Sequence, residues 1–257
     1  MKILIGIVFR GGSDFIEPCV QSIIDNTLCN FDLILIGFEC EKISDKLKKF
    51  NHEIYTERRS VSKNWNKIIQ NYKKYDLIAI LNDDILLPKI GRQNKCWLTV
   101  LSEYLENNRN TAVASPNWSN IELEDFKYLN WDVNFEVEDG MQGMCFVVKS
   151  SVIEQLINKD GYCFDEKYIC QWEDVDFLYR VHSLNYEAKI LKFLNIFHYG
   201  SKTINSMPHK FIDENYKNGM NLFFSKNNIK PSNFWTVHNS IYMFKDRENE
   251  KFNKFGY

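Results

Sequence analysis

The sequence of 257 residues lacks any apolar run long enough to cross a membrane, and it lacks an excess of charge of either sign. A membrane-spanning helix needs about 20 apolar residues. The 32 basic and 34 acidic residues leave a net charge of −2, so there is no basic field to attract nucleic acid or anionic lipid. We therefore expect no transmembrane segment and no nucleic-acid partner.

Cysteine pairs of the CxxC type are also absent. The seven cysteines are an odd number, so the sequence predicts neither a full disulfide framework nor a structural zinc site. Reduced, mostly buried thiols favour a cytoplasmic location. The apolar start at residues 3–9 resembles part of a signal peptide, but Arg10 and Asp14 interrupt it, and a buried strand is the better interpretation.

What the sequence does contain is typical of a folded α/β protein. Hydrophobic residues make up 44% and charged residues 26%, which indicates a globular chain. Aromatic residues, at 15%, are abundant. They can fill a core or line a pocket that stacks rings or sugars. Four tryptophans are candidates for such stacking, with ordinary packing as the alternative: Trp118, Trp131, Trp172 and Trp235.

The first 115 residues alternate between apolar runs and amphipathic segments. Strands are predicted at 3–9, 31–38, 52–57, 77–81 and 111–115, and helices at 16–24, 43–50, 60–75 and 95–107. Apolar strands separated by helices indicate a parallel sheet that is covered on both faces. Ligands bind such sheets beyond the carboxyl ends of the strands, so the residues directly after each strand are candidates for a site.

The second half of the chain is less regular. Residues 117–142 are rich in Asn, Trp, Glu and Asp and predict a loop-rich crossover. Strands are expected at 144–149 and 187–193, and helices at 151–158, 174–183 and 211–226. Because no repeat or linker is evident, we expect residues 1–257 to form one domain. Its predicted parts are 1–116, 117–230 and a tail at 231–257.

The predicted strand 77–81 runs directly into Asn82-Asp83-Asp84. Acidic side chains at the end of a buried strand cost desolvation energy unless something compensates them, and a hard cation such as Mg²⁺ or Mn²⁺ would do so. Asn82 and Asp84 lie on the same side of an extended chain. The alternative is a turn that ends the strand, since Asn and Asp form turns.

A second acidic group and one histidine are further candidates. Glu173, Asp174 and Asp176 stand near the start of a predicted helix, where acids also complement the helix dipole. His198 follows the predicted strand 187–193. A lone histidine is commonly structural, so His198 becomes a candidate ligand only if it converges on the acidic groups.

Five segments in this order resemble the family 2 glycosyltransferases, which have the GT-A fold. They are residues 57–66 (ERRSVSKNWN), 80–84 (ILNDD), 143–149 (GMCFVVK), 164–180 with its Trp172-Glu173-Asp174 core, and His198. The resemblance extends from about residue 2 to residue 226. It implies an α/β, Rossmann-like and mostly parallel sheet flanked by helices, with a loop-rich acceptor-side half.

The resemblance also implies a reaction. One sugar would pass, with inversion, from a nucleotide-diphosphate sugar, with UDP as the first expectation, to a hydroxyl of a glycan, lipid-linked or protein acceptor. Mn²⁺ or Mg²⁺ would be held by Asn82, Asp84 and His198. Asp174, with Glu173 second, would take the proton of the acceptor hydroxyl. The oligomeric state is not indicated.

Residues implied to bind the nucleotide donor are Arg10, Glu39, Arg59, Asn66 and Asp83. The alternative for the two arginines is a solvated surface position. The sequence departs from the family where Asn82 replaces an acid and where Glu39 stands in place of an aspartate. The Gln-x-x-Arg-Trp motif of processive synthases is absent, which favours the addition of one sugar at a time.

Two other functions stay open at this stage. Arg10-Gly11-Gly12-Ser13 faintly resembles the glycine-rich phosphate loop of a sugar-phosphate nucleotidyltransferase. Asn82, as a weaker neutral ligand, is compatible with a non-catalytic module that binds nucleotides or glycans.

Overall fold

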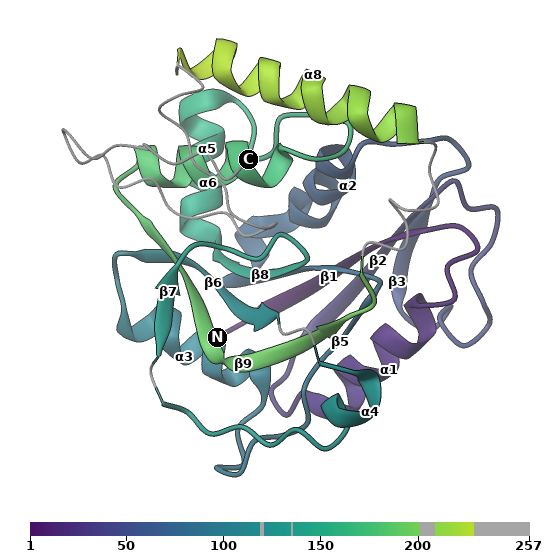
Figure 1. The fold of residues 1–257 in the computed structure, drawn as a ribbon, viewed down its shortest axis with the longest axis vertical. Coiled ribbons are helices and arrows are strands. Elements are labelled where there is room, and N and C mark those ends of the chain that lie inside the picture. Colours follow the sequence, from purple (N-terminus) through teal and green to yellow (C-terminus); the bar gives the residue numbers. More distant parts are fainter. Residues whose placement is uncertain (119–120, 135, 201–208, 229–257) are drawn as a thin grey trace.

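The computed structural model describes residues 1–118, 121–134, 136–200 and 209–228. Within these residues, nine strands form one sheet in the order β3-β2-β1-β4-β8-β6-β9-β5, and β7 pairs with β9 (Figure 1). The strands are β1 (Ile3–Arg10), β2 (Asp32–Phe38), β3 (Asn51–Ile54), β4 (Leu77–Asn82), β5 (Ile85–Leu86), β6 (Thr111–Trp118), β7 (Val137–Asp139), β8 (Cys145–Lys149) and β9 (Glu187–His198). The helices are α1 (Ile16–Asn26), α2 (Val61–Ile68), the 3₁₀ helix η1 (Ile69–Lys74), α3 (Trp97–Asn107), α4 (Leu123–Phe126), α5 (Ser150–Asp160), α6 (Glu173–Ser183) and α8 (His209–Asn227).

The sheet has a parallel half and a mixed half. Strands β3, β2, β1 and β4 are parallel neighbours, so their carboxyl ends lie at one edge. Strand β8 runs antiparallel between β4 and β6, and β6 is parallel to β9. Within the mixed half, β9 skips residues: Pro116 pairs with Leu191 but Asn117 pairs with Asn195. This irregularity is a bulge in β9.

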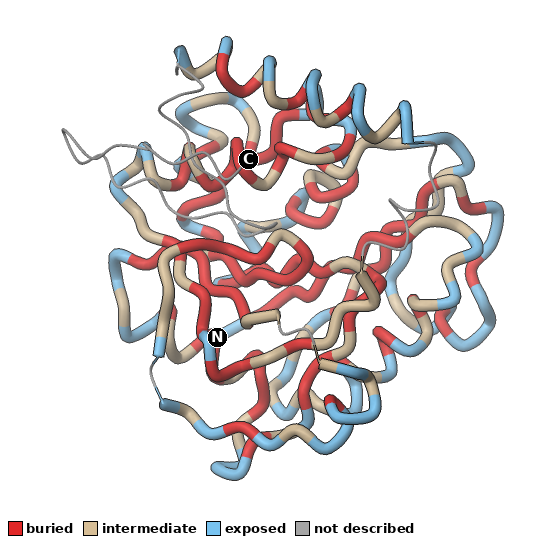
Figure 2. Tube along the Cα trace, viewed as in Figure 1, coloured by how far each residue is buried: buried red, intermediate tan, exposed pale blue. Residues whose placement is uncertain are grey.

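Helices cover both faces of the sheet (Figure 1). Strand β1 shows why, because its alternating side chains enter two cores. Ile5 belongs to the core that includes residues of α1 and α3, and Leu4 belongs to the core that includes residues of α2, α5 and α6. The buried segments in Figure 2 run through the sheet and the inward sides of the helices. At Gly6, a Cβ atom would overlap the side chain of Ile68, so α2 and β1 approach each other closely only because this residue is glycine.

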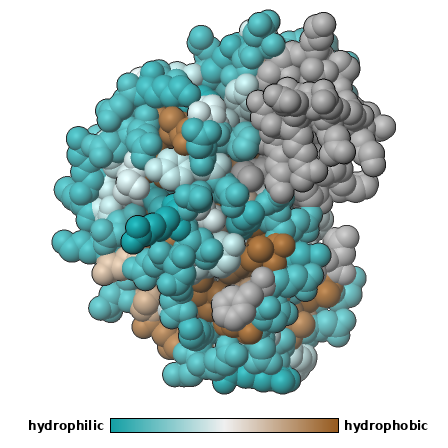
Figure 3. All heavy atoms as spheres, turned by 90° about the vertical axis from the view of Figure 1, so that its left-hand side faces the viewer, coloured by the Kyte–Doolittle hydropathy of each residue, from teal (hydrophilic) through white to brown (hydrophobic). Residues whose placement is uncertain are grey.

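The surface is mostly polar. The face that looks left in Figure 1 is largely hydrophilic, and apolar side chains gather in its lower part (Figure 3). Among the residues that the structure describes, no helix combines the length and the apolar character needed to pass through a membrane.

Most predicted elements are confirmed, with several differences. The helix predicted at 60–75 is divided: the α-helix α2 ends at Ile68, and the 3₁₀ helix η1 follows, with a non-helical backbone at Asn71. The helix predicted at 43–50 is wrong: Ser44 accepts hydrogen bonds from the amides of Leu47 and Lys48, and the chain forms turns that bury Ile43 and Leu47. Because these turns already bury both apolar side chains, the segment does not need to be helical. Strands β5 and β7 were not predicted, because they are too short to show a periodic pattern. Strand β9 continues to His198, five residues past its predicted end.

Candidate functional site

Parallel pairing brings the ends of three strands to one edge of the sheet. Val8 pairs with Asn82, and Arg10 pairs with Phe38, so the last residues of β1, β2 and β4 are neighbours. Glu39 follows directly after β2. The predicted candidates Arg10, Glu39 and Asn82 therefore share the edge where α/β sheets bind their ligands.

Asp84 and His198 meet beside this edge. The Oδ2 atom of Asp84 lies 3.2 Å from Nε2 of His198, and both side chains are buried. Antiparallel pairing of β5 with the end of β9 sets His198 opposite Ile85, and the amide of Tyr199 donates to the Asp84 carbonyl at 2.9 Å. His198 therefore lies against one of the two acidic groups, the segment 82–84. Its role as a metal ligand stays a prediction.

Asp83 points to a different partner, the loop between β1 and α1. Its Oδ2 atom accepts a hydrogen bond from the hydroxyl of Ser13. Burial, reinforced by the neighbouring Asp84, raises the pKa of Asp83 to about 7 despite that hydrogen bond. Asn82 is fixed through its backbone, because its amide donates to the carbonyl of Met144 at 2.9 Å.

The acidic segment at the start of α6 contacts the residue next to Met144, which is Gly143. A Cβ atom at Gly143 would overlap Oδ2 of Asp174, so the glycine leaves room for the carboxylate. The amide of Val175 donates to the other carboxylate oxygen at 2.9 Å. Because Met144 bonds to Asn82 and Gly143 contacts Asp174, residues 143–144 lie between the two acidic segments.

Glu173 is the most isolated of these acids. It is 8% exposed, and its Oε2 atom has no hydrogen-bond partner within the described residues. Burial raises its pKa, and the adjacent Asp174 raises it further. Burial also raises the pKa of Asp174. Glu173 is buried and Asp174 is half-buried, and two adjacent carboxyl groups shielded from water hold a proton more tightly than either would in water.

Glu39, directly after β2, joins Arg10 at the end of β1 to Arg58 in the loop after β3. Its carboxylate is 2.5 Å from Nε of Arg10 and 3.7 Å from Nε of Arg58. Arg58 also lies over the ring of Phe211 in α8, 4.0 Å from its centre. Arg58 was not among the predicted site residues, although its position next to Arg59 in a polar loop was a usable signal.

Arg59 and Asn66 have structural contacts. Arg59 stacks on Tyr55, 3.7 Å from the ring centre, and donates to Asn64 at 2.9 Å. Asn66 donates to the carbonyl of Phe164 at 2.8 Å and accepts from its amide at 3.1 Å. These bonds join α2 to the loop before α6. Donor binding by Arg59 and Asn66 stays a prediction.

Of the four candidate tryptophans, two are packed in the core and one lies beside the site. Trp131 is buried against Phe193. Trp172 is buried beneath α8, where it contacts Phe223. Trp118 is half-buried, and its ring centre is 5.9 Å from that of His198, so it lies beside the candidate metal residues. Trp235 lies outside the described residues.

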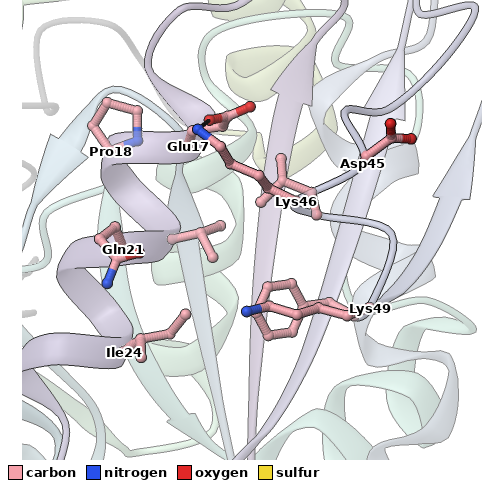
Figure 4. Close-up of a pocket in the computed structure, with 10 residues that line it drawn as sticks. Glu17, Pro18, Gln21, Ile24, Asp45, Lys46 and Lys49 are labelled. Atoms are coloured by element: carbon pink, nitrogen blue, oxygen red, sulfur yellow. Dashed lines mark hydrogen bonds and ion pairs between the residues drawn. The ribbon is translucent and has the colours of Figure 1, made fainter.

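A groove of about 470 Å³ lies elsewhere, between α1 and the turn at 45–50 (Figure 4). Glu17 and Lys46 form an ion pair of 3.0 Å across it. The groove has apolar walls from Val20, Ile24 and Phe50. It carries none of the acid clusters described above, so the candidate site is the strand edge and not this groove.

The fit of a divalent cation rests on the donor atoms present. Within the described residues, no group of three or more His, Cys, Asp or Glu side chains is placed to hold a metal ion by itself. Asp84 and His198 supply two donors, a carboxylate oxygen and an imidazole nitrogen, and both suit Mn²⁺. The set is completed only if Asn82 and donor phosphates add oxygens, as is usual for metals that bind nucleotides.

No protein-family model matches the chain, and no curated protein sequence is similar to it. Many solved structures share its fold, and three of them, each 12% identical, are described here. GalNAc-T7 with UDP, GalNAc and Mn²⁺ has a TM-score of 0.57 and covers 77% of this chain and 43% of its own. S. aureus TarS 1–349 with UDP-GlcNAc has a TM-score of 0.59 and covers 88% and 66%. The mannosyltransferase PcManGT from Pyrobaculum calidifontis with GDP-Man and Mn²⁺ has a TM-score of 0.58 and covers 88% and 63%.

These neighbours are glycosyltransferases of the GT-A type, so the predicted GT-A fold is confirmed. The chain spans about four tenths to two thirds of the length of these proteins.

Proposed function

We propose that this protein is an inverting, metal-assisted glycosyltransferase that moves one sugar from a nucleotide-diphosphate sugar to an acceptor hydroxyl. The observation that carries the proposal is the meeting of Asp84 and His198 at the carboxyl edge of a GT-A sheet. Residues 143–144 link this meeting point to the half-buried Asp174, which follows the buried Glu173. The GT-A neighbours hold UDP, UDP-GlcNAc or GDP-Man, which supports a nucleotide-sugar donor.

Asp84, His198 and Asn82 are the residues that would hold Mn²⁺ or Mg²⁺. When bound, such a cation supplies charge to a diphosphate leaving group as a Lewis acid. The buried position of Asp84 suits this task, because an ion pair is stronger where water is excluded. The Nε2 atom of His198 lies 3.2 Å from the carboxylate oxygen of Asp84, close enough for the two atoms to ligate one cation together.

Arg10 and Arg58 face the same edge through their shared partner Glu39. Guanidinium groups at this edge suit the phosphates of a nucleotide. The carboxylate of Glu39 suits a hydrogen-bond donor, such as a hydroxyl of the ribose or an N–H of the base. The base follows from the neighbours only as a first expectation, which is uracil.

Asp174 is the proposed general base. Its carboxylate takes the proton of the acceptor hydroxyl while that oxygen bonds to the anomeric carbon, and the bond from the carbon to the diphosphate oxygen breaks. A single displacement inverts the anomeric centre. The raised pKa of Asp174 makes it a stronger base than an ordinary carboxylate near neutral pH. The adjacent Glu173, also of raised pKa, keeps the proton affinity of the pair high.

A thermal-shift screen of UDP, GDP and their sugars, with and without Mn²⁺, tests the proposal. We expect a nucleoside diphosphate to raise the melting temperature by several degrees only when Mn²⁺ is present, and Asp84→Ala to abolish that shift. Donor hydrolysis and transfer are then followed by release of the nucleoside diphosphate. Absence of any shift and of any turnover would contradict the proposal, and binding without turnover would favour the non-catalytic alternative.

A further inference from the structure

Two neighbouring residues before α6 have an unusual backbone conformation. Gln171 and Trp172 have φ angles of 72° and 70°, in the left-handed region that few side chains adopt. Among the described residues, the other non-glycine positions with a positive φ are Glu39, Asn94, Asn185 and Asn228. Asparagine tolerates this conformation. The three positions that need a special reason therefore belong to the candidate site or lie within two residues of Glu173.

The left-handed turn at 171–172 decides where α6 begins. Trp172 is the N-cap of α6, and no side chain caps the helix there. Its carbonyl accepts the amide of Asp176 at 3.0 Å. Because an N-cap residue normally has an extended backbone and a short polar side chain, local sequence does not explain this helix start. The positions of Glu173 and Asp174, in the first turn of α6, depend on the turn at 171–172.

Helix α8 packs against this turn and lies beside α6 (Figure 1). The side chain of Trp172 is buried, and its ring centre lies 5.6–5.8 Å from those of three aromatic residues of α8, which are Tyr216, Phe223 and Phe224. Lys226 of α8 forms an ion pair of 2.8 Å with Asp176. Helix α8 therefore contacts the start of α6 at two points, the N-cap residue and the end of the first turn.

Gly219 allows α8 to approach the turn closely. A Cβ atom at position 219 would lie 3.0 Å from Cδ1 of Trp172, 3.1 Å from its Cβ and 3.2 Å from the carbonyl oxygen of Gln171. Glycine inside a helix costs stability, and Gly219 is not among the glycines with a positive φ. The close approach of the two segments is therefore the reason for a glycine here.

The Asp174 carboxylate has little room for displacement. Its Oδ2 atom fills the space that a side chain at Gly143 would need, and its Oδ1 atom accepts the amide of Val175 at 2.9 Å. Gly143 belongs to the segment that leads to Asn82, whereas Val175 belongs to α6. A shift of the start of α6 by a few tenths of an ångström therefore moves the carboxylate relative to the rest of the candidate site.

We propose that helix α8 positions the general base, and that Gly219 and Trp172 are the positioning residues through which it does so. The packing of α8 keeps the left-handed turn at 171–172 in place, and that turn places the Asp174 carboxylate. This inference rests on the proposed function, because it concerns Asp174 as the base. An ordinary packing role for Trp172 would instead predict an effect on stability alone.

The experiment compares Gly219→Ala with Asn218→Ala, which changes the exposed neighbouring residue of α8. Intrinsic helix propensity favours both substitutions, but only the methyl group at 219 presses on Trp172 and on the Gln171 carbonyl. A misplacement of about 1 Å can cost about 100-fold in rate, so a smaller shift should lower the kcat for release of nucleoside diphosphate about tenfold. The KM for the donor should stay within about twofold, because only the chemical step is affected. Asn218→Ala should change neither constant.

A double variant separates positioning from general damage to the structure. If Gly219 acts through the Asp174 carboxylate, adding Gly219→Ala to Asp174→Asn should cause no further loss of kcat. Two losses that multiply would overturn the proposal, because they would show that Gly219 acts independently of the base. A kcat for Gly219→Ala equal to that of Asn218→Ala would overturn it as well.

Amide hydrogen exchange gives a measurement that needs no turnover. We expect the peptide that covers residues 171–176 to exchange faster in Gly219→Ala than in the wild type, and at the wild-type rate in Asn218→Ala. Unchanged exchange in Gly219→Ala would overturn the inference whether or not the protein turns over a donor. Faster exchange in a protein without turnover would contradict the proposed function and would support the control of this turn by α8.

Discussion

Helix α6 carries two buried carboxylates with opposite surroundings. Asp176 is fully buried, and both of its oxygens are engaged, by Nε of Arg180 and Nζ of Lys226, each at 2.8 Å. Glu173, three residues earlier, is nearly as buried, yet its Oε2 has no hydrogen-bond partner within the described residues. The charge of Asp176 is therefore compensated by two basic side chains of the protein, Arg180 and Lys226.

This difference separates acids that serve the fold from acids that serve a ligand. A buried charge without compensation is costly, so the protein keeps one only where a proton or a ligand will neutralise it. Asp176 belongs to a network with Asp165, Arg180 and Lys226 that fastens α8 to the rest of the molecule. Asp174, next to Glu173 in the chain, faces the glycine at 143, and the proposed mechanism brings the acceptor to this carboxylate.

The sharpest way to test the comparison is the substitution Asp174→Asn. We expect the rate of transfer to fall by about 10²–10⁴-fold, the usual worth of a general base, while the melting temperature changes little. Initial rates and thermal unfolding measured on the same preparation give both quantities. Full activity in this variant would remove Asp174 from the mechanism.

The matched change on the compensated side is Asp176→Asn. It leaves Arg180 and Lys226 with less compensation, so we expect a loss of about 3–5 kcal/mol in the free energy of unfolding. Urea unfolding followed by circular dichroism measures it. An unchanged midpoint would show that this network contributes little to the free energy of unfolding. Asp176 could then not be described as an acid that serves the fold.

The uncompensated carboxyl should also show in the pH dependence of stability. The pKa of Glu173 is raised in the folded protein, so the folded state binds its proton more tightly than the unfolded state does. Stability should therefore be greatest below the ordinary glutamate pKa and should fall as the pH rises through the raised value.

Glu173→Gln removes this titration. We expect the variant to be more stable than the wild type at pH 8 by about 1–3 kcal/mol and nearly equal to it at pH 4. Melting temperatures of the variant and the wild type, measured from pH 4 to pH 8, test this expectation. The exposed Glu106→Gln is the control. A constant difference between variant and wild type at every pH would contradict the raised pKa.

The smallest expected effect concerns the metal. His198→Ala removes one of two buried donors, so we expect about tenfold weaker binding of Mn²⁺ in the presence of UDP, which corresponds to about 1.4 kcal/mol. Titration calorimetry measures this, with the exposed His52→Ala as the control. Equal affinity in the two variants would leave His198 with a structural role alone.

The sequence predicted the parts of the site that depend on local pattern. The apolar strand before Asn82 and the helix that begins at Glu173 follow from periodicity, and parallel strands place their ends together by geometry. It did not predict that Glu39 pairs with both Arg10 and Arg58, or that Asn66 is used by the loop at Phe164. Such contacts depend on side chains from distant segments, whose relative placement only the folded chain defines.

The bulge in β9 has a consequence for the far end of that strand. Residues of a strand alternate between the two faces of a sheet, so each skipped position inverts the phase of everything downstream. Between Leu191 and Asn195 the backbone makes such an adjustment, and His198 is the last residue of the strand. The side of the sheet on which its imidazole emerges is thus decided several residues upstream, by an irregularity of the main chain and not by the histidine itself.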